Sequence, residues 1–172
     1  MPSLNTFHSR SNAIALMICL LLLATAAYFQ YVEDLQPCPL CIVQRWILVL
    51  LAINYFIGLW LKQRRWQLTQ SSLTLIFSLL GILVAARQVW LQHLPADRVP
   101  ECGPDLNFML QHFPLRQTIS FLVTGSGECA RVTWQLLGLS MAEWMLGFFI
   151  LFAVLSVVEI GSLIPSPLEG EG

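Results

Sequence analysis

The chain has 172 residues, of which 56% are hydrophobic and only 11% are charged, and its formal net charge is −1. A typical soluble domain has roughly 25% charged residues, so this composition excludes a disordered chain and a water-soluble enzyme. The balance of nine basic and ten acidic residues gives no indication of a nucleic-acid partner. The composition therefore predicts an all-α membrane protein that crosses the bilayer several times.

Four apolar stretches are long enough for membrane-spanning helices, which need roughly 17–25 residues each. The expected spans are residues 12–32, 39–61, 67–88 and 143–163. They predict a four-helix transmembrane bundle that forms a single domain over residues 1–164. A long loop, residues 91–142, would connect the third and fourth helices, and residues 165–172 are expected to be a disordered tail.

The distribution of basic residues predicts the orientation of these spans. Lys62, Arg64 and Arg65 fall in the short loop between the second and third spans, and Arg10 precedes the first. In a bacterial inner membrane both termini would then be cytoplasmic, and the loop of residues 91–142 would be periplasmic.

The first apolar stretch allows a second interpretation, a cleaved signal peptide. Arg10 precedes it, and Ala24-Thr25-Ala26 imitates a cleavage site. However, its apolar core of residues 13–29 is longer than the usual 7–15 residues, roughly, of a signal peptide. A membrane span is therefore the favoured interpretation.

Four of the five cysteines fall on one predicted face of the membrane. Cys38 and Cys41 form a C-x-x-C pair at the start of the second span, and Cys102 and Cys129 lie in the long loop. Cys19 lies inside the first span and is expected to be a buried apolar residue. If the membrane is a bacterial inner membrane, the four cysteines face its oxidising side.

Zinc binding and structural disulfides are alternatives to redox chemistry. Zinc sites usually have two closely spaced pairs of ligands, and here only Cys38 and Cys41 have that spacing. Cys102 and Cys129 could simply brace the loop. A ring as short as Cys38–Cys41 removes little chain entropy and is a poor brace, which favours thiol–disulfide exchange.

The residues around the C-x-x-C pair support that chemistry. Pro39 suits a first helical turn, so Cys38 is expected at a helix N-terminus, where a thiolate is stabilised. Arg45 follows Cys41 by four residues and is expected on the same helix face. It could stabilise a thiolate or an anionic acceptor oxygen, or it could be an interfacial anchor.

Three other titratable residues receive weaker interpretations. His93 is expected just beyond the third span, where it could relay a proton or simply lie at the interface. His8 is given no functional role. Glu159 is expected at the interface, near the end of the fourth span.

Several segments together resemble one known family. They are Cys38-Pro-Leu-Cys41-Ile-Val-Gln-Arg45, Leu91-Gln-His-Leu-Pro95, Gly127-Glu-Cys129-Ala and Trp134-Gln-Leu-Leu-Gly-Leu-Ser-Met-Ala-Glu-Trp144. The resemblance covers roughly residues 10–162 and is to the disulfide bond formation protein B family, DsbB. It implies a four-helix bundle and a protein-dithiol:quinone oxidoreductase. Such a protein reoxidises a periplasmic, thioredoxin-fold DsbA-like oxidase and passes the electrons to ubiquinone or menaquinone.

The resemblance also implies a role for each site residue. Cys38–Cys41 and Cys102–Cys129 would be redox disulfides, and Cys102 would form the mixed disulfide with the DsbA-like partner. Cys38 would exchange with the outer pair, and Cys41 would face the quinone. Arg45 and His93 would lie near the quinone, no metal is implied, and Cys19 matches no family motif.

Three other functions stay open at this point. A protein similar to vitamin K epoxide reductase also combines a membrane C-x-x-C with quinones, although its active pair typically lies late in the chain. A non-catalytic membrane protein could use the disulfides only to brace its loop. A reductive electron conduit would be expected to have cysteines within its spans, and only Cys19 fits that pattern.

Overall fold

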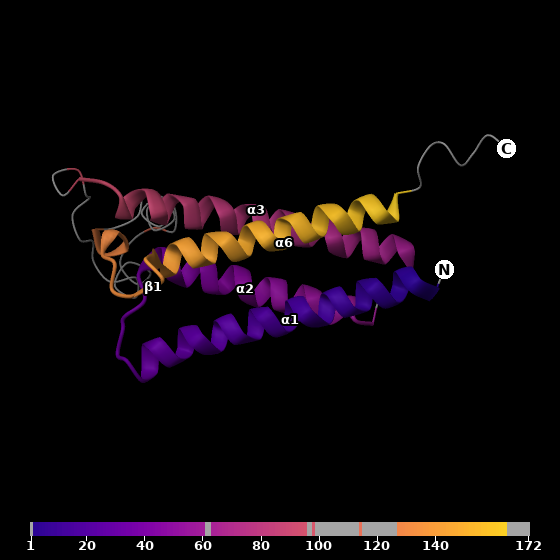
Figure 1. Cartoon of the computed structure of the whole chain (residues 1–172), viewed down its shortest axis with the longest axis horizontal. Helices are drawn as coiled ribbons and strands as arrows, with labels where there is room; N and C mark the ends of the chain where they lie inside the picture. The colour runs from indigo at the N-terminus through magenta and orange to yellow at the C-terminus, as the bar shows by residue number, and fades with distance from the viewer. Residues whose placement is uncertain (1, 61–62, 96–97, 99–113, 115–126, 165–172) are drawn as a thin grey trace.

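The computed structural model describes residues 2–60, 63–95, 98, 114 and 127–164. Four long helices run side by side through these ranges (Figure 1): α1 (Pro2–Tyr31), α2 (Pro39–Gly58), α3 (Arg64–Gln92) and α6 (Met141–Leu163). By length and composition, each is apolar enough to cross a membrane. The prediction of a four-helix transmembrane bundle is confirmed.

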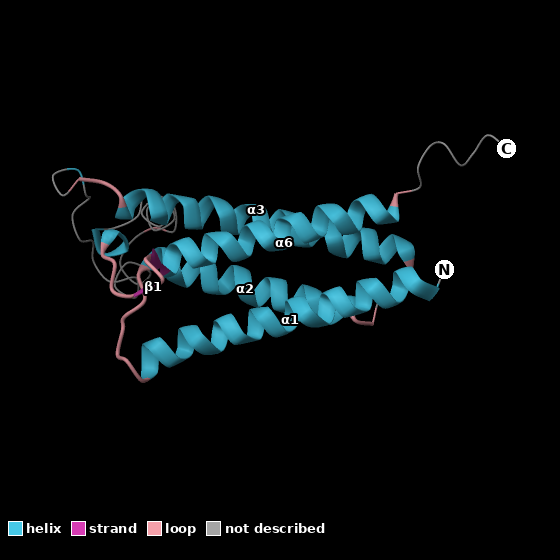
Figure 2. Ribbon diagram, in the orientation of Figure 1, coloured by secondary structure: helices cyan, strands magenta, loops and turns pink. Residues whose placement is uncertain are grey.

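The two ends of the bundle differ in what they carry. The start of α1 and the end of α6 lie at the same end of the bundle, which we call the termini end (Figure 1). The opposite end, which we call the cysteine end, carries the short elements η2 (Gly127–Ala130), β1 (Gln135–Leu136) and β2 (Leu139–Ser140). Figure 2 shows these short elements beside the start of α6.

The packing of the helices follows from small residues and apolar side chains at their contacts. α3 packs along α6 and α2, and α1 packs along α2. At Gly81 of α3, an added Cβ atom would lie 2.4 Å from the ring of Phe149, so glycine is what allows α3 and α6 to come this close. Many large apolar side chains point outward instead, as expected of helices that face lipid.

Capping fixes where two of the helices begin. α6 starts with a capping box, in which Ser140 Oγ accepts from the backbone N–H of Glu143 and the Glu143 carboxylate accepts from the backbone N–H of Ser140. α2 starts at Pro39, directly after Cys38. These two starts place the C-x-x-C pair and the β1–β2 hairpin at the same end of the bundle.

The β1–β2 hairpin leads the chain into α6. Its register pairs Gln135 with Ser140 and Leu136 with Leu139. Leu137 and Gly138 form the turn with φ values of 55° and 82°, as a two-residue type I′ turn requires. This tight turn keeps the segment after Cys129 against the bundle.

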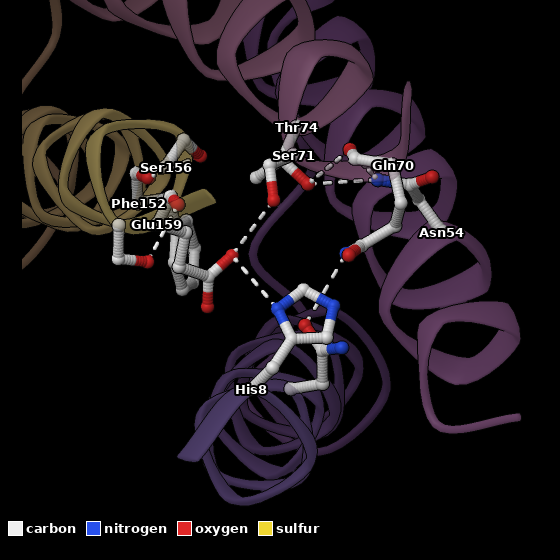
Figure 3. A network of polar contacts seen from close by, with 10 residues as sticks. His8, Asn54, Gln70, Ser71, Thr74, Phe152, Ser156 and Glu159 are labelled. Carbon is white, nitrogen blue, oxygen red and sulfur yellow. Dashed lines mark hydrogen bonds and ion pairs between the residues drawn. The ribbon is translucent and has the colours of Figure 1, made fainter. Parts of the chain in front are cut away.

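Polar contacts at the termini end involve all four long helices (Figure 3). Glu159 Oε2 accepts from Ser71 Oγ at 3.0 Å and lies 3.6 Å from His8 Nδ1. Asn54 Nδ2 donates to Thr74 Oγ1 at 2.7 Å. Glu159 lies near the end of α6, as expected, and is only 5% exposed, so its carboxylate is buried between the helices. Its partners come from α1 and α3, and the sequence alone does not bring them together.

Candidate redox site

Cys38 and Cys41 lie at the first turn of α2. Cys38 is the N-cap and Pro39 occupies the first turn, as the sequence predicts. The backbone N–H of Cys41 donates to Cys38 Sγ at 3.3 Å, and the two Sγ atoms are 2.8 Å apart. The structure gives both as free thiols. The unpaired N–H groups and the dipole at this helix end stabilise a negative sulfur.

Cys129 also contacts Cys38. It lies in η2, is 1% exposed, and packs with Cys38, Leu40 and Leu91 in one buried cluster. The hydrogen bond with Cys129, the hydrogen bond with Cys41 and burial all raise the pKa of the Cys38 thiol. Cys38 therefore favours its thiol form, which differs from the thiolate expected at this helix N-terminus, and it contacts two other sulfurs. Cys102 lies outside the described residues.

Two glutamines that the sequence analysis did not single out complete the surroundings of these sulfurs. Gln88 Nε2, from α3, lies 3.3 Å from Cys41 Sγ and 3.6 Å from Cys38 Sγ. Gln44 Nε2, from α2, donates to Gln88 Oε1 at 2.7 Å. A polar side chain within an apolar span was the available signal for both residues.

Arg45 joins α2 to the end of α1. Its guanidinium donates to the side chain of Gln30 and, at 3.0 Å, to the carbonyl oxygen of Ala26. The side chain is half-buried. These contacts hold a positive charge one helical turn beyond Cys41.

Cys41 and Arg45 line the same cavity, which has a volume of about 390 Å³. The ends of α1, α2 and α6 and the β1–β2 hairpin surround it, with Gln88 of α3. The lining is mostly apolar and includes Phe29 and Trp134, whose ring centroids are 5.1 Å apart. A largely apolar cavity with a few convergent polar groups is typical of a site for a small organic molecule.

His93 is placed differently from the cysteines. It is the C-cap of α3, and its side chain is 68% exposed. Its Nδ1 donates to the carbonyl oxygen of Val89 at 2.9 Å, and its Nε2 lies 3.9 Å from Glu143 Oε1. His93 is not among the residues that line the cavity. The structure thus brings Cys38, Cys41, Cys129 and Arg45 together and leaves His93 on the surface nearby.

Two further observations concern Cys19 and metal binding. Cys19 is completely buried in the core formed by the helices, as predicted. Within the part of the chain that the structure describes, no three or more His, Cys, Asp or Glu side chains are arranged to hold a metal ion.

Comparisons with known proteins agree with this geometry. The sequence profile of a family described as "Disulfide bond formation protein DsbB" matches residues 8–159. A protein from Nitrosococcus oceani named "Disulfide bond formation protein B" is 42% identical over 149 residues, which cover 86% of this chain and 88% of that protein. A protein of the same name from Paracidovorax citrulli is 38% identical over 163 residues, with 95% and 91% coverage.

The matched region contains α2, α3, most of α1 and α6, the C-x-x-C pair and Cys129. The relatives are similar to this chain over nearly its whole length and nearly the whole of theirs. The chain therefore belongs to the DsbB family of membrane oxidoreductases for disulfide bond formation.

Proposed function

We propose that this chain oxidises the dithiol of a periplasmic DsbA-like protein and transfers the electrons to ubiquinone or menaquinone in the membrane. One observation carries the proposal. Cys38 contacts both Cys129 and Cys41, and Cys41 and Arg45 line an apolar cavity. A chain of neighbouring sulfurs that ends at such a cavity suits electron transfer from a protein thiol to a lipophilic acceptor.

The cysteine roles that the family resemblance implies give a balanced sequence of exchanges. A thiolate of the reduced partner attacks Cys102 of a Cys102–Cys129 disulfide, which forms a mixed disulfide and releases Cys129 as a thiolate. The second partner thiol resolves the mixed disulfide and leaves Cys102 reduced. Cys129 attacks Cys38 of the Cys38–Cys41 disulfide and releases Cys41 as a thiolate beside the cavity. Cys102 then attacks Cys129, which re-forms the Cys102–Cys129 disulfide and leaves Cys38 and Cys41 as the reduced pair that must be reoxidised. The contacts of Cys38 with both other sulfurs support this order.

The residues of the cavity fit a quinone. The rings of Phe29 and Trp134 and the apolar side chains around them suit its ring and the start of its isoprenoid tail. The Arg45 guanidinium provides a fixed donor and a positive charge for an anionic oxygen. When bound, the quinone accepts the two electrons and two protons that the partner's dithiol loses. His93, which does not line the cavity, could contribute only through a neighbour such as Glu143.

The charge distribution supports the orientation that this function requires. Arg10, Arg64 and Arg65 all belong to the termini end of the bundle, and basic residues near short loops favour the cytoplasmic side. The cysteine end would then face the periplasm of a bacterial inner membrane, where a DsbA-like partner is available. Labelling of the reduced protein with a membrane-impermeant thiol reagent tests this orientation, because Cys102 would have to react from outside.

Replacement of one sulfur tests the proposed route. Cys41→Ser should reduce quinone reduction by a reduced DsbA-like protein to the uncatalysed rate, because the final thiolate cannot form. The measurement is the loss of quinone absorbance in purified, quinone-supplied protein. Cys19→Ser is the matched control, since Cys19 is a buried thiol away from the cavity, and it should keep turnover. Normal turnover in Cys41→Ser would contradict the proposal.

A further inference from the structure

Two buried glutamines lie at the level of the reactive sulfurs, and the route above gives neither of them a role. Gln88 of α3 is 4% exposed and Gln44 of α2 is 3% exposed. A buried primary amide is costly unless its donors and acceptor are satisfied. Polar groups inside membrane-spanning helices often mark functional sites. The hydrogen-bond partners of Gln44 and Gln88 therefore indicate the functional role of these two residues.

The hydrogen bond between the two amides fixes the orientation of Gln88. Gln44 Nε2 donates to Gln88 Oε1 at 2.7 Å, so the two hydrogens of Gln88 Nε2 are directed at the sulfurs. Through these hydrogens Gln88 Nε2 contacts Cys41 Sγ at 3.3 Å and Cys38 Sγ at 3.6 Å. The opposite orientation would direct the Gln88 carbonyl oxygen at the sulfurs and would repel a thiolate. The observed orientation suits a site where negative charge develops.

The negative charge develops on Cys41 when the couple is reduced. Two electrons and one proton convert the Cys38–Cys41 disulfide into one thiol and one thiolate. In the proposed route Cys41 is the sulfur released as a thiolate, so the charge develops on Cys41, and Cys38 Sγ lies 2.8 Å from it as a neighbouring thiol. Gln88 is then the second donor to the charged sulfur, from a different helix.

We propose that Gln88 is a further catalytic residue, whose amide stabilises the Cys41 thiolate, and that Gln44 is a positioning residue that orients this amide. The inference rests on the proposed function, because it requires Cys38 and Cys41 to be a redox couple. A couple whose reduced form is stabilised is a stronger oxidant. Gln88 therefore favours acceptance of electrons by this pair.

A redox equilibrium measures this effect without a quinone or a protein partner. The full chain carries Cys102→Ser and Cys129→Ser, so that only the Cys38–Cys41 couple titrates against glutathione in detergent. Mass-tagging of thiols counts the reduced fraction, with Cys19 as a constant background. Gln88→Met keeps the side-chain volume and removes the donor. It should raise the equilibrium constant for disulfide formation about tenfold, equivalent to a potential lower by about 30 mV.

Gln70→Met is the matched control. Gln70 is a buried glutamine of the same helix, 2% exposed. It precedes Gln88 by 18 residues, which is about 27 Å along α3 at about 1.5 Å per residue. This substitution should lower the melting temperature and leave the redox equilibrium constant unchanged. A shift as large as that of Gln88→Met would overturn the inference.

A double variant separates the chemical role of Gln88 from a packing role. Gln88→Met leaves Gln44 Nε2 without its acceptor, and Gln44→Met/Gln88→Met removes that unpaired amide. The double variant should recover the melting temperature and keep the tenfold shift in the equilibrium constant. Recovery of both quantities, or no shift in Gln88→Met, would overturn the inference and leave the proposed function intact. If the unsubstituted couple forms no disulfide at any glutathione ratio, the proposed function itself fails.

Discussion

The two ends of the bundle both bury polar side chains, but they use them differently. At the termini end, Glu159 pairs with Ser71 and His8, and Asn54 pairs with Thr74 (Figure 3). At the cysteine end, Gln44 donates to the Gln88 carbonyl oxygen, and the amide N–H donors of Gln88 are directed at two sulfurs beside a cavity.

This difference separates a structural use of buried polarity from a chemical one. Polar contacts between membrane helices contribute about 1 kcal/mol each and fix which helix faces align. The network at the termini end joins α1, α2, α3 and α6 in this way. At the cysteine end the polar atoms surround atoms that change charge. Substitutions at the first end should therefore change stability, and those at the second should change catalysis.

The largest contrast is expected between two arginines, one at each end. Arg45 lines the cavity, whereas Arg64 donates to the carbonyl oxygen of Leu163 at the end of α6. Arg45→Met should raise the KM for quinone about 10- to 100-fold, because a hydrogen bond to a charged group contributes about 1.5–3 kcal/mol. Arg64→Met should leave this KM unchanged and lower the melting temperature. Steady-state kinetics over a range of quinone concentrations measure the first effect.

Equal KM values for Arg45→Met and the unsubstituted protein would mean that Arg45 only ties α2 to α1 through Ala26. Arg45→Lys refines the result. Lysine keeps the charge but cannot reproduce the planar, forked donors of arginine. It should therefore give a KM between those of the arginine and methionine proteins.

A smaller effect, on stability alone, is expected at the termini end. Ser71→Ala removes the donor to the buried Glu159 carboxylate and should lower the free energy of unfolding by about 1–2 kcal/mol. Its kcat and KM should not change. Ser72→Ala is the control, because Ser72 is the exposed neighbour on the same helix. Thermal unfolding in detergent measures both, and a loss of activity in folded Ser71→Ala protein would contradict the division between the two ends.

The same comparison shows how far the sequence could predict this molecule. The four spans follow from composition, and the place of Cys38 at the N-cap of α2 follows from Pro39 in the first turn. Both features could therefore be predicted from the sequence, and both are confirmed. The contact between Cys38 and Cys129 could be expected only from the family resemblance, because it depends on how the long loop folds back. The partners of Gln88 and Glu159 come from other helices, and one sequence does not reveal those pairings.

The smallest effect tests how tightly the network at the termini end is packed. A Cβ atom at Gly58 would lie 2.7 Å from Asn12 Nδ2 and 2.9 Å from Gln70 Cδ, so Gly58→Ala must displace both amides. It should lower the free energy of unfolding by about 1 kcal/mol, because displacement of packed groups outweighs the higher helix propensity of alanine. Gly161→Ala, on α6 at the same end, meets nothing within 4 Å and should be neutral or slightly stabilising. If Gly58→Ala proves equally neutral, the amides of Asn12 and Gln70 can move freely, and the polar contacts at the termini end would not contribute to stability through tight packing.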